Sequence, residues 1–495
     1  MKTSSSAKTI ESLLTSLSYE WNHHGSLDQL VKGVTADSRE VKEGDLFVAI
    51  QGPVLDGHEF IEDAIRRGAV AIVTNRQKEK ALQLTHVMVE DTQKAFAQML
   101  LRFHGLDLSQ IQLIGITGTN GKTTIAHLLY FLLNRLSSAG MIGTIDCQWK
   151  NKTLKTPNTT PGPAFLFPVL SQMIKDGIQY GIMEVSSHAL DQKRTSQLYF
   201  FVRVFTNLTQ DHLDYHPTID DYFLAKKSLF TQLPMPQCAV INQDDPYGRQ
   251  LVKALDPSII LTYGKDSKAQ FSASHIVSTL DSTRFILQFQ GETCPVEVPL
   301  VLEHNVSNVL AALAVMEAIG FSIKQATEHL KSFPGVSGRM EAVPSGKDFH
   351  VFVDYAHTPD AFQHVLSGIR PLIKNRLIVV FGCGGNRDKG KRPRMGRIAS
   401  QYADLLILTN DNPRFENPAE ILTQIQEDLV PGFRTKHEVV PDRRTAIQKA
   451  INEAKAGDAV LILGKGHEAE QIVGSTKLAF SDQLVARECI QARGC

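Results

Sequence analysis

A glycine-rich turn in the first third of the chain carries residue types suited to binding phosphate. Residues 118–124 read GTNGKTT, between the apolar run IQLIGI and an apolar helical pattern. Glycine lets the backbone fold close to an anion, and the first N–H groups of a helix attract negative charge. Lys122 can reach the β- and γ-phosphates of a nucleotide, and the Thr123 hydroxyl can bind Mg²⁺. The sequence therefore predicts an ATP-binding loop made of Gly118, Thr119, Asn120, Gly121, Lys122, Thr123 and Thr124.

The spacing of this loop departs from the standard phosphate-loop pattern. GxxxxGK[ST] would require glycine at position 116, where the chain has Ile116, and Gly115 lies one place early. A GKT triplet alone is common by chance, whereas GTNGKTT between a clear strand and a clear helix is much less so. We therefore favour phosphate binding over an ordinary strand-to-helix turn.

Polar residues also follow two further apolar strands. GIMEV carries Glu184 at its end, and VRVFTNLTQDH places Asn207, Asp211 and His212 just beyond another strand. Sites of α/β proteins assemble at such strand ends, where a carboxylate is the expected second support for Mg²⁺, so Glu184 is the candidate. Its alternative is a solvated strand cap. His212 can bind a metal as neutral imidazole or simply cap a turn, and the phosphate loop and Glu184 favour the metal role.

The last third of the chain carries charged residues in loops that follow apolar strands. Arg387, Arg414 and Lys465 lie in such loops, with Glu468 close to Lys465 in sequence. Arginine binds a carboxylate through two parallel hydrogen bonds and a carboxylate holds an ammonium, so this mixture suits a zwitterionic amino acid. A solvated rim of salt bridges is the alternative, and for Lys465 both interpretations stay open.

A nicotinamide-binding fold is a competing explanation for this last segment. Its loop reads GCGGNR from Gly382, so the third glycine of GxGxxG would fall at Arg387. Dinucleotide binding is therefore not favoured.

Three α/β domains must position these groups. The sequence predicts a small α/β domain over residues 1–108 and a central parallel sheet with the phosphate loop over residues 109–337. Over residues 338–495 it predicts a second, Rossmann-like doubly wound sheet. In the first domain, Asp37, Ser38 and Arg39 fit a capped turn without a catalytic role.

Composition narrows the class of protein. The chain has 495 residues, and its 52 Lys and Arg balance its 52 Asp and Glu. This neutrality disfavours nucleic acid or an anionic membrane as partner. The sequence has no signal-peptide core and no apolar stretch of transmembrane length, and its six scattered cysteines suggest neither a zinc site nor a disulfide framework. We expect a cytoplasmic monomer that acts on small molecules.

A series of motifs occurs in one order over most of the chain: GTNGKTT, MEVSSHAL, TNLTQDHLDYH, AKKSLF, EHNVSNVLAA, GRME and VDYAHTPDA. Together they resemble the Mur ligases, the ATP-dependent amide-bond formers of peptidoglycan precursor synthesis. Within that family, DSREVKEGDLFVAIQG and the longer segment MEVSSHALDQKR resemble the tripeptide synthetases. These enzymes add the third residue to UDP-MurNAc-L-Ala-D-Glu.

The resemblance implies roles for individual residues. Ser38 would contact the uridine end of the substrate. Lys226 would be carbamylated, because bound CO₂ turns its cation into a carboxylate that supports a second Mg²⁺; a lysine on a helix surface, as for its neighbour Lys227, is the alternative. The other implied contacts are Asn158, Thr159, Thr160, Ser186, Gln192 and Arg194 for the muramoyl dipeptide, and Asn305, Arg339 and Asp354 for ATP.

The segment Asp411, Asn412, Pro413, Arg414 is the most informative for the choice of amino acid. DNPR is similar to the signature of synthetases that add meso-diaminopimelate, whereas lysine-adding relatives lack this arginine. Diaminopimelate has a second carboxylate at its far end that Arg414 can pair with, and lysine would leave the guanidinium without that partner. By the same resemblance, Arg387, Gly464 and Glu468 complete the pocket.

The implied reaction joins diaminopimelate to the D-Glu γ-carboxylate through an acyl phosphate, with ADP and phosphate as products. The catalytic groups would be Lys122, Glu184, His212 and carbamylated Lys226, and Thr123 would join the last three in binding two Mg²⁺ ions. Positioning and charge neutralisation would supply most of the catalysis.

Alternatives from the same and from a different class remain. A sibling enzyme could add L-lysine or D-Ala-D-Ala, or resemble a folylpolyglutamate synthetase, although DNPR and VSSHAL disfavour the D-Ala-D-Ala and folyl siblings. A nucleotide-gated regulatory module without turnover is the other alternative, which the intact set of Lys122, Glu184, His212 and Lys226 disfavours.

Overall fold

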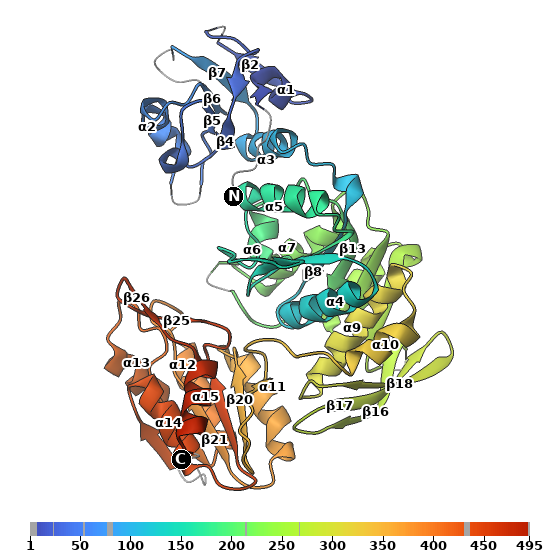
Figure 1. Ribbon diagram of the computed structural model, residues 1–495, viewed down its shortest axis with the longest axis vertical. Helices are drawn as coiled ribbons and strands as arrows, with labels where there is room; N and C mark the ends of the chain where they lie inside the picture. Colours follow the sequence, from blue (N-terminus) through green and yellow to red (C-terminus); the bar gives the residue numbers. More distant parts are fainter. Residues whose placement is uncertain are drawn as a thin grey trace. The chain divides into compact units, whose positions relative to one another are not determined.

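The structure is a computed structural model that describes residues 7–22, 24–52, 55–76, 83–212, 215–266, 268–429 and 436–493. Figure 1 shows its elements, which are α/β throughout. The chain forms two compact units. The first comprises Met1–Thr117, Leu133–Arg203 and Ala225–Gln237, and the second comprises Gly118–Leu132, Val204–Leu224 and Cys238–Cys495.

The N-terminal sheet belongs to the first unit. Its strand order is β2 (Tyr19–Trp21), β7 (Thr85–Val89), β6 (Ala71–Thr74), β5 (Asp45–Val48) and β4 (Gly33–Thr35). Strands β4 to β7 are parallel and β2 is antiparallel. Every residue of β5 and β6 is buried, as expected for parallel strands covered on both faces. The remaining elements are β1 (Lys8–Thr9), α1 (Ile10–Leu14), β3 (Leu30–Val31), η1 (Ser38–Glu40), η2 (Gly57–Phe60), α2 (Ile61–Arg66), α3 (Thr92–Phe103) and η3 (Leu108–Gln110).

The central sheet has the strand order β11 (Lys152–Leu154), β10 (Cys147–Trp149), β9 (Ala139–Ile142), β12 (Tyr180–Glu184), β8 (Gln112–Thr117), β13 (Phe200–Phe205), β14 (Cys238–Asn242), β15 (Ile260–Gly264), β16 (Phe271–Ser278), β17 (Thr283–Phe289) and β18 (Glu292–Val298). Its helices are α4 (Lys122–Leu136), α5 (Pro163–Lys175), α6 (Ser187–Asp191), α7 (Ile219–Thr231), α8 (Pro246–Ala254), α9 (His304–Ala318) and α10 (Ile323–Leu330), with the short turn η4 (Pro257–Ile259). The predicted strand, glycine turn and helix around the phosphate loop are confirmed as β8, the four residues after it, and α4.

This sheet is mixed, whereas the sequence predicted a parallel one. Strands β9, β12 and β8 are parallel, but β10–β11 and β16–β17–β18 are antiparallel hairpins. At the β17–β18 turn, Gln290 and Gly291 both have positive φ, 49° and 81°, which is the geometry that suits a two-residue hairpin turn. A QG pair is a weaker turn signal in sequence than NG or DG, which is why these hairpins were not predicted.

The C-terminal sheet lies in the second unit and is doubly wound, as predicted. Its order is β19 (Glu341–Ala342), β20 (His350–Asp354), β24 (Ala459–Leu463), β21 (Leu377–Phe381), β22 (Leu405–Leu408) and β23 (Lys436–Val439), all parallel except β19. Apolar residues of α11 (Pro359–Ile369), α12 (Lys391–Tyr402) and α13 (Pro418–Gln426) pack on one face, and those of α14 (Arg443–Glu453) and α15 (Asp482–Ala492) on the other. The turn η5 (Arg370–Leu372) and the hairpin β25 (Glu470–Val473) with β26 (Thr476–Ala479) complete the domain.

The predicted α/β class with mostly parallel sheets is therefore confirmed. Across the described ranges, no helix is both long and apolar enough to span a membrane.

Candidate active site

The phosphate loop connects β8 to α4 through a backbone that requires glycine. Gly118 has φ of 145° and Gly121 has φ of 88°. A Cβ on Gly118 would lie 1.8 Å from Thr206 Oγ1, and a Cβ on Gly121 would lie 2.5 Å from Asn308 Oδ1. Both positions therefore exclude other residues by conformation and by space.

Lys122 is the first residue of α4, and its side chain folds back over the loop. Its Nζ donates to the carbonyl oxygens of Gly118 and Thr119, each at 2.8 Å. An ammonium at this place, beside the first N–H groups of a helix, creates a positively charged site suited to phosphate.

The segment after β13 holds the other side of the loop. Asn207 accepts from the backbone N–H of Thr119 at its own carbonyl (2.8 Å) and from that of Asn120 at Oδ1 (2.9 Å). Thr206 Oγ1 donates to the Asn120 carbonyl at 2.6 Å. The sequence placed Asn207 beyond a strand but gave it no role, and Thr206 was missed, because contacts over nearly ninety positions leave no local signal.

The residues predicted to bind ATP beyond the loop lie in the same unit as the loop. Arg339 Nη2 donates to Thr123 Oγ1 at 3.2 Å, and its guanidinium stacks over the Tyr355 ring at 4.8 Å. Asp354 accepts from the backbone N–H groups of Met340 and Ala356, both at 2.7 Å. Burial raises the pKa of Asp354, against the opposing effects of Arg339 and these two N–H groups.

Asn305 begins the buried part of α9. Its Nδ2 donates to the Val301 carbonyl at 2.7 Å, and its Oδ1 accepts from Asn308 Nδ2 at 2.9 Å. Asn308 is the residue that closes off space at Gly121, so Asn305 is linked to the phosphate loop through a single side chain.

Glu184 ends β12 in register with Ile116 of β8, close to where that strand enters the phosphate loop. Its side chain is buried, with 1% exposure, so it is not a solvated strand cap. Thr144 donates to both carboxylate oxygens: its N–H to Oε1 and its hydroxyl to Oε2, each at 2.9 Å. Thr144 was missed by the sequence analysis, because it follows a short strand that carries no motif.

The predicted dipeptide-binding residues form a network within the first unit. Thr160 Oγ1 donates to the Glu184 carbonyl at 2.8 Å and accepts from Ser186 N–H at 2.9 Å. Arg194 donates to the Thr160 carbonyl at 2.9 Å and to Gln192 Oε1 at 3.0 and 2.6 Å. Thr159 Oγ1 lies 3.1 Å from Thr144 Oγ1, and Asn158 is exposed in the same loop.

His212 lies beyond β13 with a left-handed backbone, φ 54°. Its carbonyl accepts from the N–H groups of Tyr215 (3.1 Å) and His216 (2.9 Å). The ring lies edge-on to Tyr222, 6.1 Å between centroids, and Nε2 is 3.5 Å from Asp211.

Lys226 and Lys227 differ in their surroundings. Lys226 of α7 is buried, with 1% exposure, whereas Lys227 is partly exposed. The interpretation as a plain helix-surface lysine therefore fails for Lys226. Among the residues that the structure describes, no group of three or more His, Cys, Asp or Glu side chains is arranged to hold a metal by itself.

The predicted amino-acid pocket is built on the DNPR segment. Arg414 has φ of 51°, its N–H donates to Ile472 O at 3.0 Å, and its Nη1 donates to Gly385 O at 2.8 Å. Asn412 Nδ2 donates to Glu468 Oε2 at 2.8 Å. Gly464 has φ of 114° and leaves no room for a Cβ beside Asp411 Oδ2, 2.8 Å away. Pro413 is buried between these groups and Arg387 is exposed on the neighbouring loop.

Lys465 has no solvent exposure and is not part of a solvated rim. Its Nζ donates to Asn412 Oδ1 (3.1 Å), Glu468 Oε2 (3.0 Å) and Glu470 O (2.7 Å). Lys465 therefore links two residues of the predicted pocket, Asn412 and Glu468, by hydrogen bonds.

Near the N-terminus, Asp37 to Arg39 form the capped turn that the sequence predicted. Asp37 Oδ1 accepts from the N–H and Nε of Arg39, both at 2.9 Å. Ser38 is buried within this turn.

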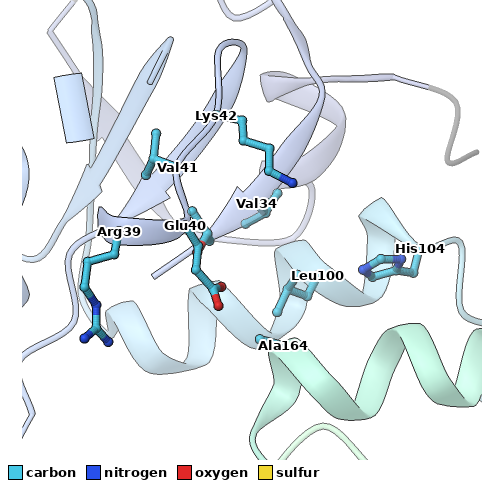
Figure 2. A pocket seen from close by; sticks show the side chains of 9 residues that line it. Val34, Arg39, Glu40, Val41, Lys42, Leu100, His104 and Ala164 are labelled. Atoms are coloured by element: carbon cyan, nitrogen blue, oxygen red, sulfur yellow. The ribbon is translucent and has the colours of Figure 1, made fainter. Parts of the chain in front are cut away.

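A pocket of about 750 Å³ adjoins this turn (Figure 2). Its cationic side chains are Arg39 and Lys42, and Ser38 does not line it. The lining residues are Val34, Thr35, Arg39, Glu40, Val41, Lys42, Leu100, His104 and Ala164.

Comparison with known proteins assigns all three parts of the chain. Residues 30–104 match the Mur ligase family, catalytic domain; residues 116–316 the Mur ligase middle domain; and residues 338–466 the Mur ligase, glutamate ligase domain. A protein of Geobacillus kaustophilus (strain HTA426), named UDP-N-acetylmuramoyl-L-alanyl-D-glutamate--2,6-diaminopimelate ligase, is 41% identical over 97% of this chain and 99% of its own. The chain belongs to the Mur ligase family. Its three-domain architecture is that of the family, as the sequence predicted.

Other Mur ligases agree with this assignment. A protein of the same name from Gloeobacter violaceus (strain ATCC 29082 / PCC 7421) is 43% identical over 94% of each chain. A solved structure of a ligase of that name has a TM-score of 0.72 at 31% identity and covers 99% of this chain and 100% of its own. MurF from Acinetobacter baumannii shares the fold, with a TM-score of 0.66 at 20% identity and 98% of each chain covered.

Proposed function

We propose that this Mur ligase adds meso-diaminopimelate to UDP-MurNAc-L-Ala-D-Glu, with ATP as co-substrate, in peptidoglycan synthesis. The D-Glu γ-carboxylate attacks the γ-phosphorus of ATP, and ADP leaves. The amine of diaminopimelate then attacks the carbonyl carbon of the acyl phosphate and loses a proton, and phosphate leaves. The products are UDP-MurNAc-tripeptide, ADP and phosphate.

The observation that carries this proposal is the anchoring of Arg414 and Glu468 to one short segment. Arg414 follows Asn412 by two residues, and Asn412 binds Glu468 at 2.8 Å. A guanidinium and a carboxylate held on one frame suit a substrate that offers a carboxylate and an ammonium. The relatives of about 40% identity, whose printed name is a 2,6-diaminopimelate ligase, support the same substrate.

Lys122 neutralises charge that develops on the transferred phosphate, because it lies at the N-terminus of α4 with its ammonium on the carbonyl oxygens of Gly118 and Thr119. Thr144 keeps the Glu184 carboxylate oriented. Arg339, Asn305 and Asp354 hold the remainder of ATP.

Mg²⁺, when bound, supplies charge neutralisation at the phosphates. We assign the binding of two Mg²⁺ ions to Thr123, Glu184, His212 and carbamylated Lys226. Mg²⁺ in nucleotide enzymes is held by one or two carboxylates together with substrate phosphates, and Glu184 is the carboxylate assigned to that role here. Lys226 is buried, so a charged group at this position needs a partner of opposite charge, which Mg²⁺ would supply to a carbamate.

The muramoyl dipeptide is assigned to Asn158, Thr159, Thr160, Ser186, Gln192 and Arg194, and the uridine end to Ser38. We place the domain boundaries at 108/109 and 337/338. We further propose a cytoplasmic monomer without nucleic-acid or membrane partners.

Product mass analysis tests the proposal. The enzyme is incubated with ATP, Mg²⁺, UDP-MurNAc-dipeptide and an equimolar mixture of meso-diaminopimelate, L-lysine and D-Ala-D-Ala, and ADP release is measured with each acceptor alone. We expect the diaminopimelate product to predominate. Ligation of L-lysine or D-Ala-D-Ala in its place would assign the chain to a sibling activity, and ATP binding without any ligation would indicate a regulatory module.

A further inference from the structure

Two loops supply the arginines of the proposed amino-acid pocket, and both are bonded to the ion pair of Arg392 with Glu416, whose carboxylate also lies 3.8 Å from the exposed Lys389. One loop follows β21 and carries Gly384 to Arg387. The other is the DNPR segment, followed by Phe415 and Glu416. Neither Glu416 nor its partner Arg392 is part of the pocket assigned above.

Arg392 of α12 and Glu416 form a buried, two-pronged pair. Nη1 lies 2.9 Å from Oε2 and Nη2 lies 3.1 Å from Oε1, with side-chain exposures of 0% and 16%. The same guanidinium donates to Gln424 Oε1 (2.6 Å) and to Gly384 O (3.1 Å). The hydrogen bonds from Arg392 lower the pKa of Glu416 to about 2, so the pair stays charged at neutral pH.

Glu416 also fixes the loop that carries Arg387. Its Oε1 accepts from the backbone N–H of Asn386, and Asn386 Oδ1 accepts in return from Phe415 N–H at 3.1 Å. Asn386 has φ of 53°, a conformation that must be held by such contacts. The ion pair therefore ties Arg387's neighbour to the end of the DNPR segment.

Arg414 depends on the same loop. Its Nη1 donates to Gly385 O at 2.8 Å, and Gly385 N–H donates to Asn412 O at 2.9 Å. Gly385 has no room for a side chain, since a Cβ would lie 1.9 Å from Pro413 O. A shift of this loop would therefore move the carbonyl that orients the Arg414 guanidinium.

We propose that Glu416 and Arg392 are positioning residues that determine specificity, because they hold Arg414 and Arg387 where both can meet the distal carboxylate of a diamino-dicarboxylic acid. This inference rests on the proposed function. It assigns discrimination against lysine to a buried ion pair that lies outside the substrate pocket assigned above.

The test is Glu416→Gln in the full-length enzyme, which keeps the side-chain shape and removes the charge. We expect kcat/KM for meso-diaminopimelate to fall about 10-fold, mainly through KM, because loosened arginines hold the distal carboxylate less well. The kcat/KM for L-lysine, measured at high concentration, and the KM for ATP should stay within about twofold, because neither uses the distal-carboxylate contact. Glu420→Gln, an exposed glutamate on α13, is the matched control and should change neither substrate.

Each possible result of these kinetic measurements either supports or overturns the inference. Equal losses with both amino acids, or an unchanged preference in a folded Glu416→Gln enzyme, would overturn the inference while leaving the proposed function in place. A wild-type enzyme that does not ligate diaminopimelate would overturn both. If thermal melting shows that Glu416→Gln does not fold, Asn386→Gly takes its place: glycine accepts the positive φ and removes only the bond to Phe415, and a retained preference would again overturn the inference.

Discussion

The phosphate loop and the amino-acid pocket differ in where along the chain their residues come from. The loop uses backbone groups and side chains from seven consecutive residues, 118–124, steadied from outside by Thr206 and Asn207. The pocket gathers residues from three separate segments, and buried charged side chains, Lys465 and Arg392, bond to those segments. A part shared by nucleotide enzymes can be compact in sequence, whereas selectivity for one amino acid requires distant segments to be fixed together.

The largest effect should follow from Lys122→Ala. Removing the only side-chain cation of the loop should lower the rate of ADP release about 1,000-fold, because charge on the transferred phosphate loses its partner. A coupled ADP assay with each acceptor measures this. The exposed Lys253→Ala serves as control, and turnover equal to wild type in Lys122→Ala would remove the loop from the mechanism.

Arg414→Met should affect the amino-acid pocket and leave the phosphate loop unchanged. We expect kcat/KM for meso-diaminopimelate to fall about 100-fold, with little change for L-lysine, because the distal carboxylate loses a charged hydrogen-bond partner. Steady-state kinetics with both amino acids give the ratio. Equal losses for the two would contradict a role in recognising that carboxylate.

Lys465→Met tests the frame beneath the pocket. The change leaves Asn412, Glu468 and the Glu470 carbonyl without a shared donor, so the KM for diaminopimelate should rise about 20-fold and the free energy of unfolding should fall by about 2 kcal/mol. Kinetics and urea denaturation measure the two effects. Lys477→Met, which removes a 63% exposed lysine paired with Glu470 at 3.2 Å, should do neither; a Lys465 variant with normal KM would show that the frame is dispensable.

Thr144→Val tests the metal site beside the phosphate loop indirectly, through a residue that bonds to Glu184. It deletes the hydroxyl bond to Glu184 Oε2 and keeps the N–H bond to Oε1, so the Mg²⁺ concentration for half-maximal activity should rise about 10-fold. The control is Thr153→Val, an exposed threonine on β11. An unchanged metal requirement would separate Glu184 from metal binding.

The smallest effect concerns pH. His364 and Asp360 pair at 3.3 Å, and Asp360 also accepts from Asn120 and Thr209 beside the phosphate loop. The hydrogen bond from His364 lowers the pKa of Asp360, and the bond to Asp360 raises the pKa of His364. The histidine contribution is therefore complete below its unfolded pKa and disappears as pH rises through its folded pKa, while the aspartate contribution disappears as pH falls below about 4.

His364→Ala should remove a pH-dependent stability of a few tenths of a kcal/mol, since His364 is largely exposed. Thermal melting between pH 5 and 8 would show wild type losing this margin toward pH 8. Parallel curves for variant and wild type would contradict the assignment.

The sequence predicted the α/β class, the strand, turn and helix around Lys122, and the doubly wound last sheet, because each depends on local periodicity and glycine placement. It also predicted Glu184 at a strand end. It missed Thr206, Thr144 and the ion pair of Arg392 with Glu416, and it left Lys465 undecided. These residues act through contacts over 24 to 86 positions or through burial, which no local pattern records.

The folded-back Lys122 bears on how the enzyme recycles between turnovers. Its ammonium lies on the carbonyl oxygens of Gly118 and Thr119 at 2.8 Å, so a cation is already positioned within the loop. A phosphate that binds there meets a charge that the backbone of the loop itself holds in place. Exchange of ADP for ATP therefore calls for movement of a side chain and not for refolding of the loop.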